Sequence, residues 1–270
     1  MFRIRRILAQ PLNLIMSTKD RRQRALAERE KLFLDAAWRL LNSDGLLNVQ
    51  MSRVARLCDY AVGTLYHHFT SKEDMLLALL TERAGDRIML FQRVAAWPAG
   101  TRERILGFVL ADVIFALQQP LSFHLYQYLS TQVISAACSP QRREEALAVH
   151  QPLADMFQEV IGEALACGDL PPSRMTAFHI GSGLWALSEG IHTFVHAEGL
   201  LDAYRIGSPY SLLFHHVHAL LNGLDWQPLC DIEDAAAVQQ MIRRIVSAVF
   251  SDIDPAITNP LAAATDQDTQ

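Results

Sequence analysis

Helical periodicity runs through almost the whole chain and restricts its fold more than any other feature. In most segments, apolar residues return every three or four positions, the spacing of one face of an α-helix. No convincing segment alternates apolar and polar residues as a half-buried β-strand does. Prolines interrupt helices, and here they stand at the breaks between the later segments, at positions 120, 140, 171–172, 209 and 228. The pattern predicts an all-α fold.

The same periodicity predicts where the individual helices lie. The first carries apolar residues at 32, 33, 36, 37, 40 and 41 and stops at the turn residues 42–45. Ser71, followed by acidic residues, predicts the N-cap of a helix that runs to about residue 94. The remaining helices are expected at 51–57, 62–69, 101–118, 121–137, 141–167, 174–200, 209–223 and 233–251.

Charge divides the chain into two unequal parts. Residues 1–75 hold 13 Lys and Arg against 8 Asp and Glu, a net charge of +5, whereas residues 76–270 hold 11 against 21, a net charge of −10. Half of all residues are hydrophobic, which is enough for a globular core. We therefore expect a basic N-terminal module that meets a polyanion, and an acidic remainder that does not.

Other features argue against secretion or membrane insertion. The four cysteines lie far apart without a CxxC pair, which fits reduced thiols in the cytoplasm better than disulfides or a zinc site. No run of about 18 apolar residues predicts a membrane span. Residues 1–16 resemble a signal peptide, but polar residues and a proline break the apolar run and no cleavage site follows. Met16 is an equally good candidate for the start of the protein.

The segment 62–69 is the most informative part of the sequence. On a helical wheel, one side gathers Val62, Leu65, Tyr66 and Phe69, and the other gathers Gly63, Thr64, His67 and His68. Such a short helix is marginal in water, so its apolar side must be held by neighbours such as Phe33, Trp38, Val54 and Leu57. A short, seated helix with a polar outer face, in a basic module, is typical of helix-turn-helix proteins that enter the major groove of DNA.

The motif Gly63-Thr64-Leu65-Tyr66-His67-His68-Phe69, followed by residues 71–76 (Ser-Lys-Glu-Asp-Met-Leu), resembles the DNA-binding signature of TetR/AcrR-type bacterial regulators. Upstream, Ala36-Ala37, Leu40-Leu41 and Gly45 are similar to the first helix of that family. The resemblance covers residues 28–88 and implies a DNA-binding domain there, with its helix-turn-helix at about 51–70. It further implies a helical effector-binding and dimerisation domain over 89–252. Residues 1–27 are expected to be a disordered basic leader, and 253–270 a disordered tail.

The resemblance also implies roles for single residues. Tyr66 and Lys72 would each contact a backbone phosphate, Lys72 with help from the dipole of its helix. Two further sets would approach DNA: Val62, Gly63, Thr64 and His67 in the groove, and Gln50, Ser52 and Arg53 beside the backbone. Leu65 and Phe69 would belong to the core. This chain departs from the family pattern at Asp59, where glycine is usual in the turn, and at Ala61, where a capping Ser or Thr is usual.

For the C-terminal part, the resemblance implies a pocket for a small, partly apolar effector and a homodimer. The expected pocket residues are Phe108, Tyr126, His179 and Trp185. The small residues Gly181, Gly183, Ala186 and Gly190 would let another helix approach closely, either within the chain or across a two-fold interface formed by the helices near 174–200 and 233–251. A repressor released from a palindromic operator by its effector is the implied function.

Several alternatives remain open at this stage. His192 and His196, and the group His215, His216 and His218, have spacings that metal sites use, but no Cys or carboxylate completes a set, so neither a metal nor another cofactor is expected. An enzyme on a helical bundle, with Glu189 or these histidines as site residues, has no supporting motif. A helix-turn-helix that binds protein instead of DNA conflicts with the positive charge. The basic segment 19–24 is either a disordered leader or an arm for phosphates or the minor groove.

Overall fold

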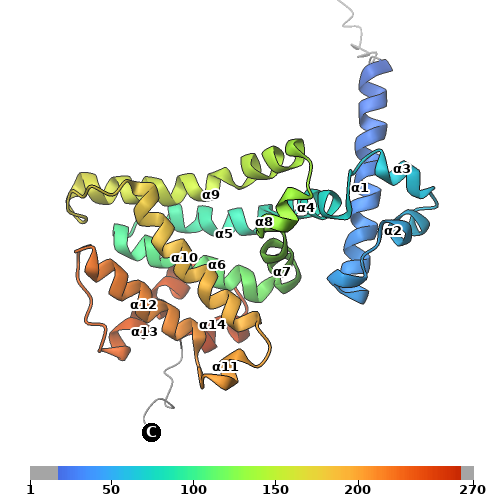
Figure 1. The fold of residues 1–270 in the computed structure, drawn as a ribbon. Coiled ribbons are helices and arrows are strands. Elements are labelled where there is room, and N and C mark those ends of the chain that lie inside the picture. Colours follow the sequence, from blue (N-terminus) through green and yellow to red (C-terminus); the bar gives the residue numbers. More distant parts are fainter. Residues whose placement is uncertain (1–17, 263–270) are drawn as a thin grey trace, which may run out of the picture. The chain divides into compact units, whose positions relative to one another are not determined.

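A computed structural model describes residues 18–262, and these contain helices and turns but no strand. The chain divides into two compact units, residues 1–75 and 76–270. The all-α prediction is therefore confirmed for the described residues (Figure 1).

The N-terminal unit is built from short helices around a small core. It contains α1 (Thr18–Asp44), the 3₁₀ turn η1 (Leu46–Asn48), α2 (Met51–Leu57), α3 (Val62–Tyr66) and the first residues of α4 (Lys72–Glu82). Phe33 of α1, Val54 of α2 and Leu65 of α3 are each fully buried. Each helix thus contributes an apolar side chain to one common core, which stabilises helices that are too short to persist alone.

The N-terminal unit differs from the sequence-based prediction at three points. Residues 18–27 form the first turns of α1, so the expectation of a disordered leader is wrong for them, because this stretch is rich in strong helix formers; residues 1–17 lie outside the described part. The helix expected over 62–69 ends at Tyr66. The helix expected from 71 to about 94 is divided by a turn at residues 83–84 into α4 and α5 (Gly85–Ala95).

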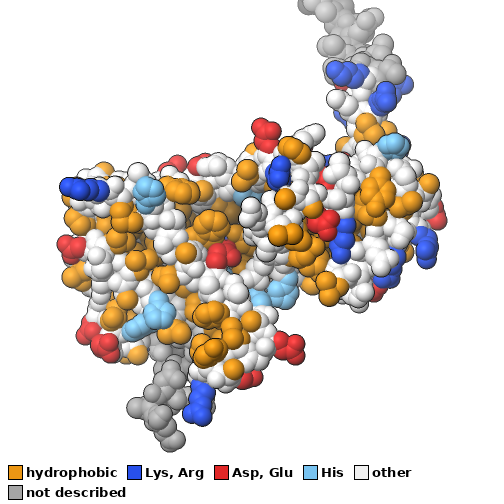
Figure 2. Space-filling model, in the orientation of Figure 1, with side chains coloured by type: hydrophobic (Ala, Val, Ile, Leu, Met, Phe, Trp, Pro, Cys, Tyr) orange, Lys and Arg blue, Asp and Glu red, His pale blue; other side chains and the backbone are white. Residues whose placement is uncertain are grey.

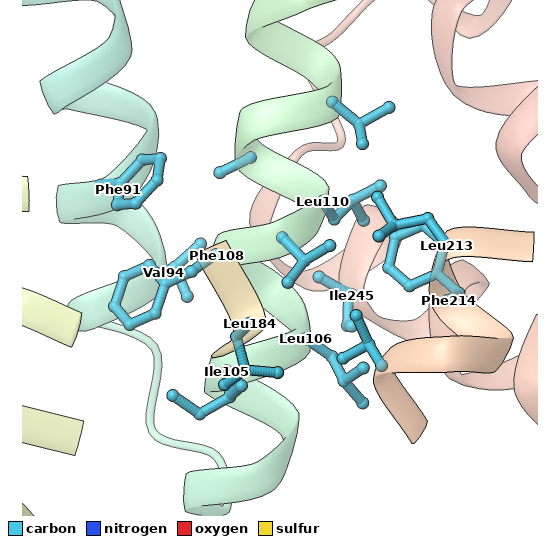
Figure 3. Close-up of a cluster of buried hydrophobic side chains, with 14 of the residues drawn as sticks. Phe91, Val94, Ile105, Leu106, Phe108, Leu110, Leu184, Leu213, Phe214 and Ile245 are labelled. Carbon is cyan, nitrogen blue, oxygen red and sulfur yellow. The ribbon is translucent and has the colours of Figure 1, made fainter. Parts of the chain in front are cut away.

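The C-terminal unit is a helical bundle arranged around α6 (Thr101–Gln118). Fourteen of the 18 residues of α6 are buried, because α5, α9, α12, α13 and α14 all pack against it. Figure 3 shows Ile105, Leu106, Phe108 and Leu110 of α6 among apolar side chains of α5, α10, α12 and α13. Gly107 allows this packing, since an added Cβ there would lie 2.8 Å from Cγ1 of Val94. The other helices are α7 (Pro120–Leu129), α8 (Gln132–Ala136), α9 (Pro140–Cys167), α10 (Ala177–His196), α11 (Leu200–Ala203), α12 (Pro209–Gly223), α13 (Ala235–Val249) and α14 (Pro255–Ala262).

Local sequence signals fix where these helices begin. Pro120, Pro140 and Pro209 each occupy a first helical position, where the missing amide hydrogen is not needed. The hydroxyl of Ser139 accepts a hydrogen bond from the amide of Arg142 at the start of α9, and the Asp234 carboxylate accepts one at the start of α13.

Two predictions fail in this unit. The single helix expected over 121–137 is two helices, α7 and α8, separated at residues 130–131. The tail expected to be disordered from 253 contains α14, whose Leu261 is buried in the core; residues 263–270 lie outside the described part. Within the chain, α10 packs beside α9 and α12, and α13 packs against α6 and α14; the expected two-fold interface stays a prediction.

No single helix among the described residues is both long and apolar enough to cross a membrane. The pair α6 and α7 passes that test by length and composition only, with a bend of 108° between the two helices.

Candidate DNA-binding surface and ligand cavity

The helix α3 is seated in the N-terminal unit by residues at and just beyond its C-terminal end. Leu65 and Phe69 are fully buried, as predicted. His68 is also turned inward: its side chain is 5% exposed, its ring packs against Phe33 at 5.3 Å, and its Nδ1 lies 3.8 Å from Oε2 of Glu30. The prediction from the helical wheel that His68 lies on the outer face is wrong. The helix ends at Tyr66, and the following turn rotates His68 toward α1.

The turn between α2 and α3 tolerates the two departures from the family pattern. Asp59 adopts the left-handed conformation with φ of 57°, which aspartate reaches more readily than most residues. Tyr60 closes the turn, its amide donating to the carbonyl of Ala55 at 3.0 Å. Ala61 is the N-cap of α3 and supplies no side-chain hydrogen bond, which costs about 1 kcal/mol relative to Ser or Thr.

The outward side of α3 offers small, uncharged groups. Gly63 and His67 are exposed and Thr64 is half-buried. An added Cβ on Gly63 would meet no other atom within 4 Å, so nothing within the unit requires a glycine there. Val62 and Tyr66 are 42% and 52% exposed, although the wheel grouped both with the apolar side. Leu57 is 57% exposed and does not support α3 as expected.

The four predicted backbone-contacting residues outside α3 lie at the N-terminal end of α2 and at the start of α4. Gln50 and Ser52 are exposed around the start of α2. Arg53 forms a salt bridge with Asp44. The pKa of the Asp44 carboxyl is lowered, chiefly by a hydrogen bond from Ser43 and next by the hydrogen bond from Arg53. Lys72 donates from Nζ to the backbone oxygen of Leu46 at 3.0 Å, which uses one of its three ammonium hydrogens.

The start of α4 has the capping arrangement that the sequence predicted. The hydroxyl of Ser71 accepts from the amide of Asp74 at 2.9 Å, and the Asp74 carboxylate accepts from the amide of Thr70 at 2.9 Å. These bonds fix the first turn of α4, from which Lys72 projects. The position of its ammonium is therefore set by α4 and by η1 together.

A cavity of about 550 Å³ lies within the C-terminal unit, lined by residues of α4 to α10. Its volume falls in the range of small-molecule sites, and its walls are largely apolar. Figure 2 shows hydrophobic side chains gathered on the face of the bundle that α10 crosses in Figure 1. Of the expected pocket residues, Phe108, Tyr126 and Trp185 line the cavity. His179 does not line it, because it is exposed in the first turn of α10, where it completes a capping box with Thr176.

Buried charges form part of the cavity wall. Arg87 donates from Nε to Oδ1 of Asp112 at 2.8 Å, and its guanidinium lies 4.7 Å from the centre of the Tyr126 ring. Burial alone would raise the pKa of Asp112, but Arg87 outweighs it, with His192 contributing, so the net effect lowers that pKa. Burial similarly raises the pKa of Tyr126. The wall thus holds an ionised pair whose two charges are already matched to each other.

Arg143 is the other arginine in the cavity wall. Its guanidinium donates to the backbone oxygen of Ser135 at 3.4 Å and forms no salt bridge among the described residues. Its neighbour Arg142 instead pairs with Glu145 at 2.9 Å.

Two of the histidines considered as metal ligands belong to packed contacts. His192 is fully buried, with Nε2 3.6 Å from Oδ2 of Asp112 and Nδ1 3.4 Å from the hydroxyl of Tyr210. His196 lies 2.8 Å from His124 between ring nitrogens, and burial and these neighbours lower the pKa of His196 to about 4. No group of three metal-binding side chains occurs within the described part of the chain.

The buried polar cluster of Arg87, Asp112 and His192, of which the first two line the cavity, was not predicted from the sequence. Arg87 and Asp112 lie 25 residues apart on α5 and α6, and His192 lies on α10. No local spacing joins them, so the only signal available was the presence of charged residues inside otherwise apolar helical stretches.

In the N-terminal unit, α2 is followed by a tight turn and then by α3, whose inner side is buried and whose outer side is exposed. This arrangement is a helix-turn-helix module. Residues 33–79 match the sequence model of "Bacterial regulatory proteins, tetR family". This segment of the chain is therefore similar to the DNA-binding region of TetR-family transcriptional regulators.

Two relatives agree with this assignment. Over 105 residues the chain is 35% identical to the HTH-type transcriptional repressor KstR of Mycolicibacterium smegmatis, covering 39% of this chain and about half, 51%, of KstR. Over 171 residues it is 26% identical to the HTH-type transcriptional regulator BetI of Escherichia coli O127:H6, covering 60% of this chain and 80% of BetI.

Solved structures support the fold. A TetR/AcrR-family regulator from Thermobifida fusca matches with a TM-score of 0.52 and 19% identity, covering 73% of this chain and 98% of that one. FadR from Bacillus subtilis, solved in complex with stearoyl-CoA, matches with a TM-score of 0.52 and 16% identity, covering 72% and 98%. At these identities the likeness extends to the fold alone.

Proposed function

We propose that the protein is a homodimeric repressor of neighbouring genes. In this proposal a small-molecule effector enters the cavity of the C-terminal unit and releases the dimer from a palindromic operator. The observation that carries the proposal is the exposed, uncharged face of α3, held from behind by Leu65 and Phe69 in a unit of net positive charge. Such a face can present side chains to base edges while neighbouring groups bind phosphates.

The proposed contacts follow the positions of the side chains. Gly63, Thr64 and His67 face the bases, with Val62 at the edge of the groove. The hydroxyl of Tyr66 and the ammonium of Lys72 donate to phosphates, and Gln50, Ser52 and Arg53 lie beside the sugar–phosphate backbone. Arg53 keeps N–H groups for a phosphate even while it pairs with Asp44, because a guanidinium has five donors.

DNA binding is tested by fluorescence anisotropy with duplexes covering the DNA upstream of the gene. Tyr66→Phe removes one hydroxyl and is expected to weaken binding about tenfold or more per protomer, since a hydrogen bond to a charged group contributes about 1.5–3 kcal/mol. Lys72→Ala is expected to reduce the slope of log K against log salt by about 0.9 per protomer.

Tyr204→Phe is the matched control, because it removes a hydroxyl that is exposed on the C-terminal unit. Unchanged affinity and salt slope in the Tyr66 and Lys72 variants would contradict the DNA-binding proposal. Thermal unfolding of each variant separates a lost contact from a lost fold.

The proposed effector is largely apolar and carries one hydrogen-bond acceptor. The apolar walls of the cavity favour such a body, and Arg143 offers donors that no carboxylate of the described residues occupies. Because FadR binds stearoyl-CoA, a bundle of this fold has room for a ligand with a long apolar part.

Ala154→Trp tests the cavity by filling it. Ala154 is half-buried in the cavity wall on α9, whereas Glu159 on the same helix is exposed and outside the lining. We expect Ala154→Trp to bind the operator normally but to lose release by a ligand that co-purifies with the wild type and is identified by native mass spectrometry. Glu159→Trp should respond as the wild type does; equal responses of both variants would place the effector elsewhere.

The proposed two-fold interface includes the open side of α10. Gly181 and Gly183 pack against other helices of the same chain. An added Cβ would meet Phe157 at 3.4 Å in the first case and Leu220 at 3.6 Å in the second. Gly190 meets no atom within 4 Å, and Ala186 is exposed on the same side of α10. Ala186→Glu is therefore expected to shift the protein toward a monomer in analytical ultracentrifugation, whereas a dimer of wild-type strength would exclude this face.

A further inference from the structure

The first helix extends well before the part of the chain that matches the TetR family. α1 begins at Thr18, whereas the family match begins at residue 33. Residues 19–28 are exposed along the helix and include four cations, namely Lys19, Arg21, Arg22 and Arg24. Figure 2 shows Lys and Arg side chains around these first turns of α1.

Contacts further along α1 show which of its sides faces α3. The ring of Phe33 lies 5.3 Å from the rings of both Tyr60, just before α3, and His68, just after it. Arg29 lies above the Tyr60 ring at 5.7 Å, and Glu30 approaches His68 at 3.8 Å. The side of α1 centred on Phe33 is therefore the side that faces the two ends of α3.

Helix geometry extends this side to the exposed cations. At about 100° per residue, Lys19 and Arg22 fall within about 40° of the direction of Phe33, whereas Arg21 and Arg24 point about 120° or more away from it. At about 1.5 Å per residue, Arg22 and Lys19 lie roughly 16 and 21 Å along the axis from Phe33. Two cations thus continue the α3-facing side of α1, and two others of equal charge face elsewhere.

We propose that Lys19 and Arg22 form a second phosphate-binding strip, which contacts the DNA backbone next to the groove that α3 occupies. The strip has the charge that phosphates require, lies on the same side of the unit as α3, and is fixed in direction because α1 is one continuous helix. It lengthens the DNA footprint of each protomer without reading bases. This inference rests on the proposed DNA binding.

The four cations provide a matched test in the full-length protein. Lys19→Gln/Arg22→Gln and Arg21→Gln/Arg24→Gln each remove two positive charges from the same turns, and glutamine keeps a comparable helix propensity. Operator affinity is measured by anisotropy over a salt series. For the Lys19/Arg22 variant we expect the slope of log K against log salt to fall by about 1.8 per bound protomer. When salt rises from about 50 to 200 mM, the factor by which its affinity falls should then be about twelve times smaller than the factor for the wild type.

A second measurement separates a direct contact from a general loss of charge. Shortening the duplex on the outer side of each half-site should weaken the wild type and the Arg21/Arg24 variant but leave the Lys19/Arg22 variant unaffected. Equal slopes in the two double variants, or equal sensitivity to duplex length, would overturn the inference while leaving the proposed DNA binding intact. If the wild type binds no DNA, the proposed function itself fails. Circular dichroism confirms that α1 stays helical in both variants.

Discussion

The N-terminal unit and the C-terminal bundle use their polar side chains in opposite ways. In the N-terminal unit, apolar residues such as Leu65 and Phe69 lie inside, and the groups proposed to bind DNA lie outside. In the bundle, the groups of interest lie within the apolar interior: Arg87, Asp112 and His192 are all buried, and the first two line the cavity. Exposed groups cost little to keep, whereas buried charges persist only when each has a partner. The comparison predicts that substitutions in the bundle chiefly affect stability and those on α3 chiefly affect binding.

The largest expected effect follows from removing the buried carboxylate in Asp112→Ala. The change leaves Arg87 charged and unpaired in the interior and removes the neighbour of His192, so the free energy of unfolding should fall by about 3–5 kcal/mol. Urea unfolding followed by near-ultraviolet circular dichroism measures the loss. Asp252→Ala is the control. Asp252 pairs with Arg93 but is 68% exposed, so its loss should lower the free energy of unfolding by about 1 kcal/mol or less. Similar losses in the two variants would break the contrast between the interior and the surface.

A smaller effect is expected from pH, through a buried histidine of α12. His218 is 1% exposed, and burial and Arg102 lower its pKa from 6.5 to about 4. Arg102 donates to Nδ1 of His218 at 3.2 Å, which requires the neutral ring, because arginine cannot accept. Between pH 6.5 and about 4 the unfolded chain binds a proton that the folded chain does not. The free energy of unfolding should therefore be highest above pH 6.5 and fall toward pH 4, by at most about 1.4 kcal/mol per pH unit from this residue.

Urea midpoints measured across this pH range test the assignment. His218→Gln should flatten the pH dependence, although His196, whose pKa is also lowered to about 4, will keep part of it. The exposed His216, replaced by glutamine, is the control and should leave the dependence unchanged. A dependence that stays the same without His218 would show that other groups cause it.

The smallest change in stability, and the sharpest test of the outer face of α3, comes from Gly63→Ala. Because an added Cβ meets nothing within 4 Å, the substitution should leave the fold intact and stabilise α3 by about 0.5–1 kcal/mol. The same methyl group lies where base edges would approach, so operator affinity should fall on the order of tenfold, or about 1.4 kcal/mol. Gly162→Ala, at an equally open position toward the C-terminal end of α9, should gain similar stability without any loss of DNA binding. An unchanged affinity of the Gly63 variant would mean that α3 does not approach bases through this residue.

Local interactions explain what the sequence determined by itself. The all-α class, the bounds of α6 and α12 and the capping of α4 by Ser71 and Asp74 all depend on residues within a few positions of each other. The helix-turn-helix was recognisable for the same reason, because its residues are consecutive in the chain. Their contacts with DNA remain predictions.

Only the tertiary structure decided which residues face inward and what surrounds the cavity. It turned His68 toward α1, exposed Leu57 and Tyr66, placed His179 outside the cavity, and brought Arg87, Asp112 and His192 together from three helices. Helical periodicity gives the direction of a side chain relative to its own axis, but the neighbour it meets depends on how helices distant in sequence pack. The free energy of a buried charge depends on that neighbour, so neither the cavity nor its ion pair was encoded in any local pattern.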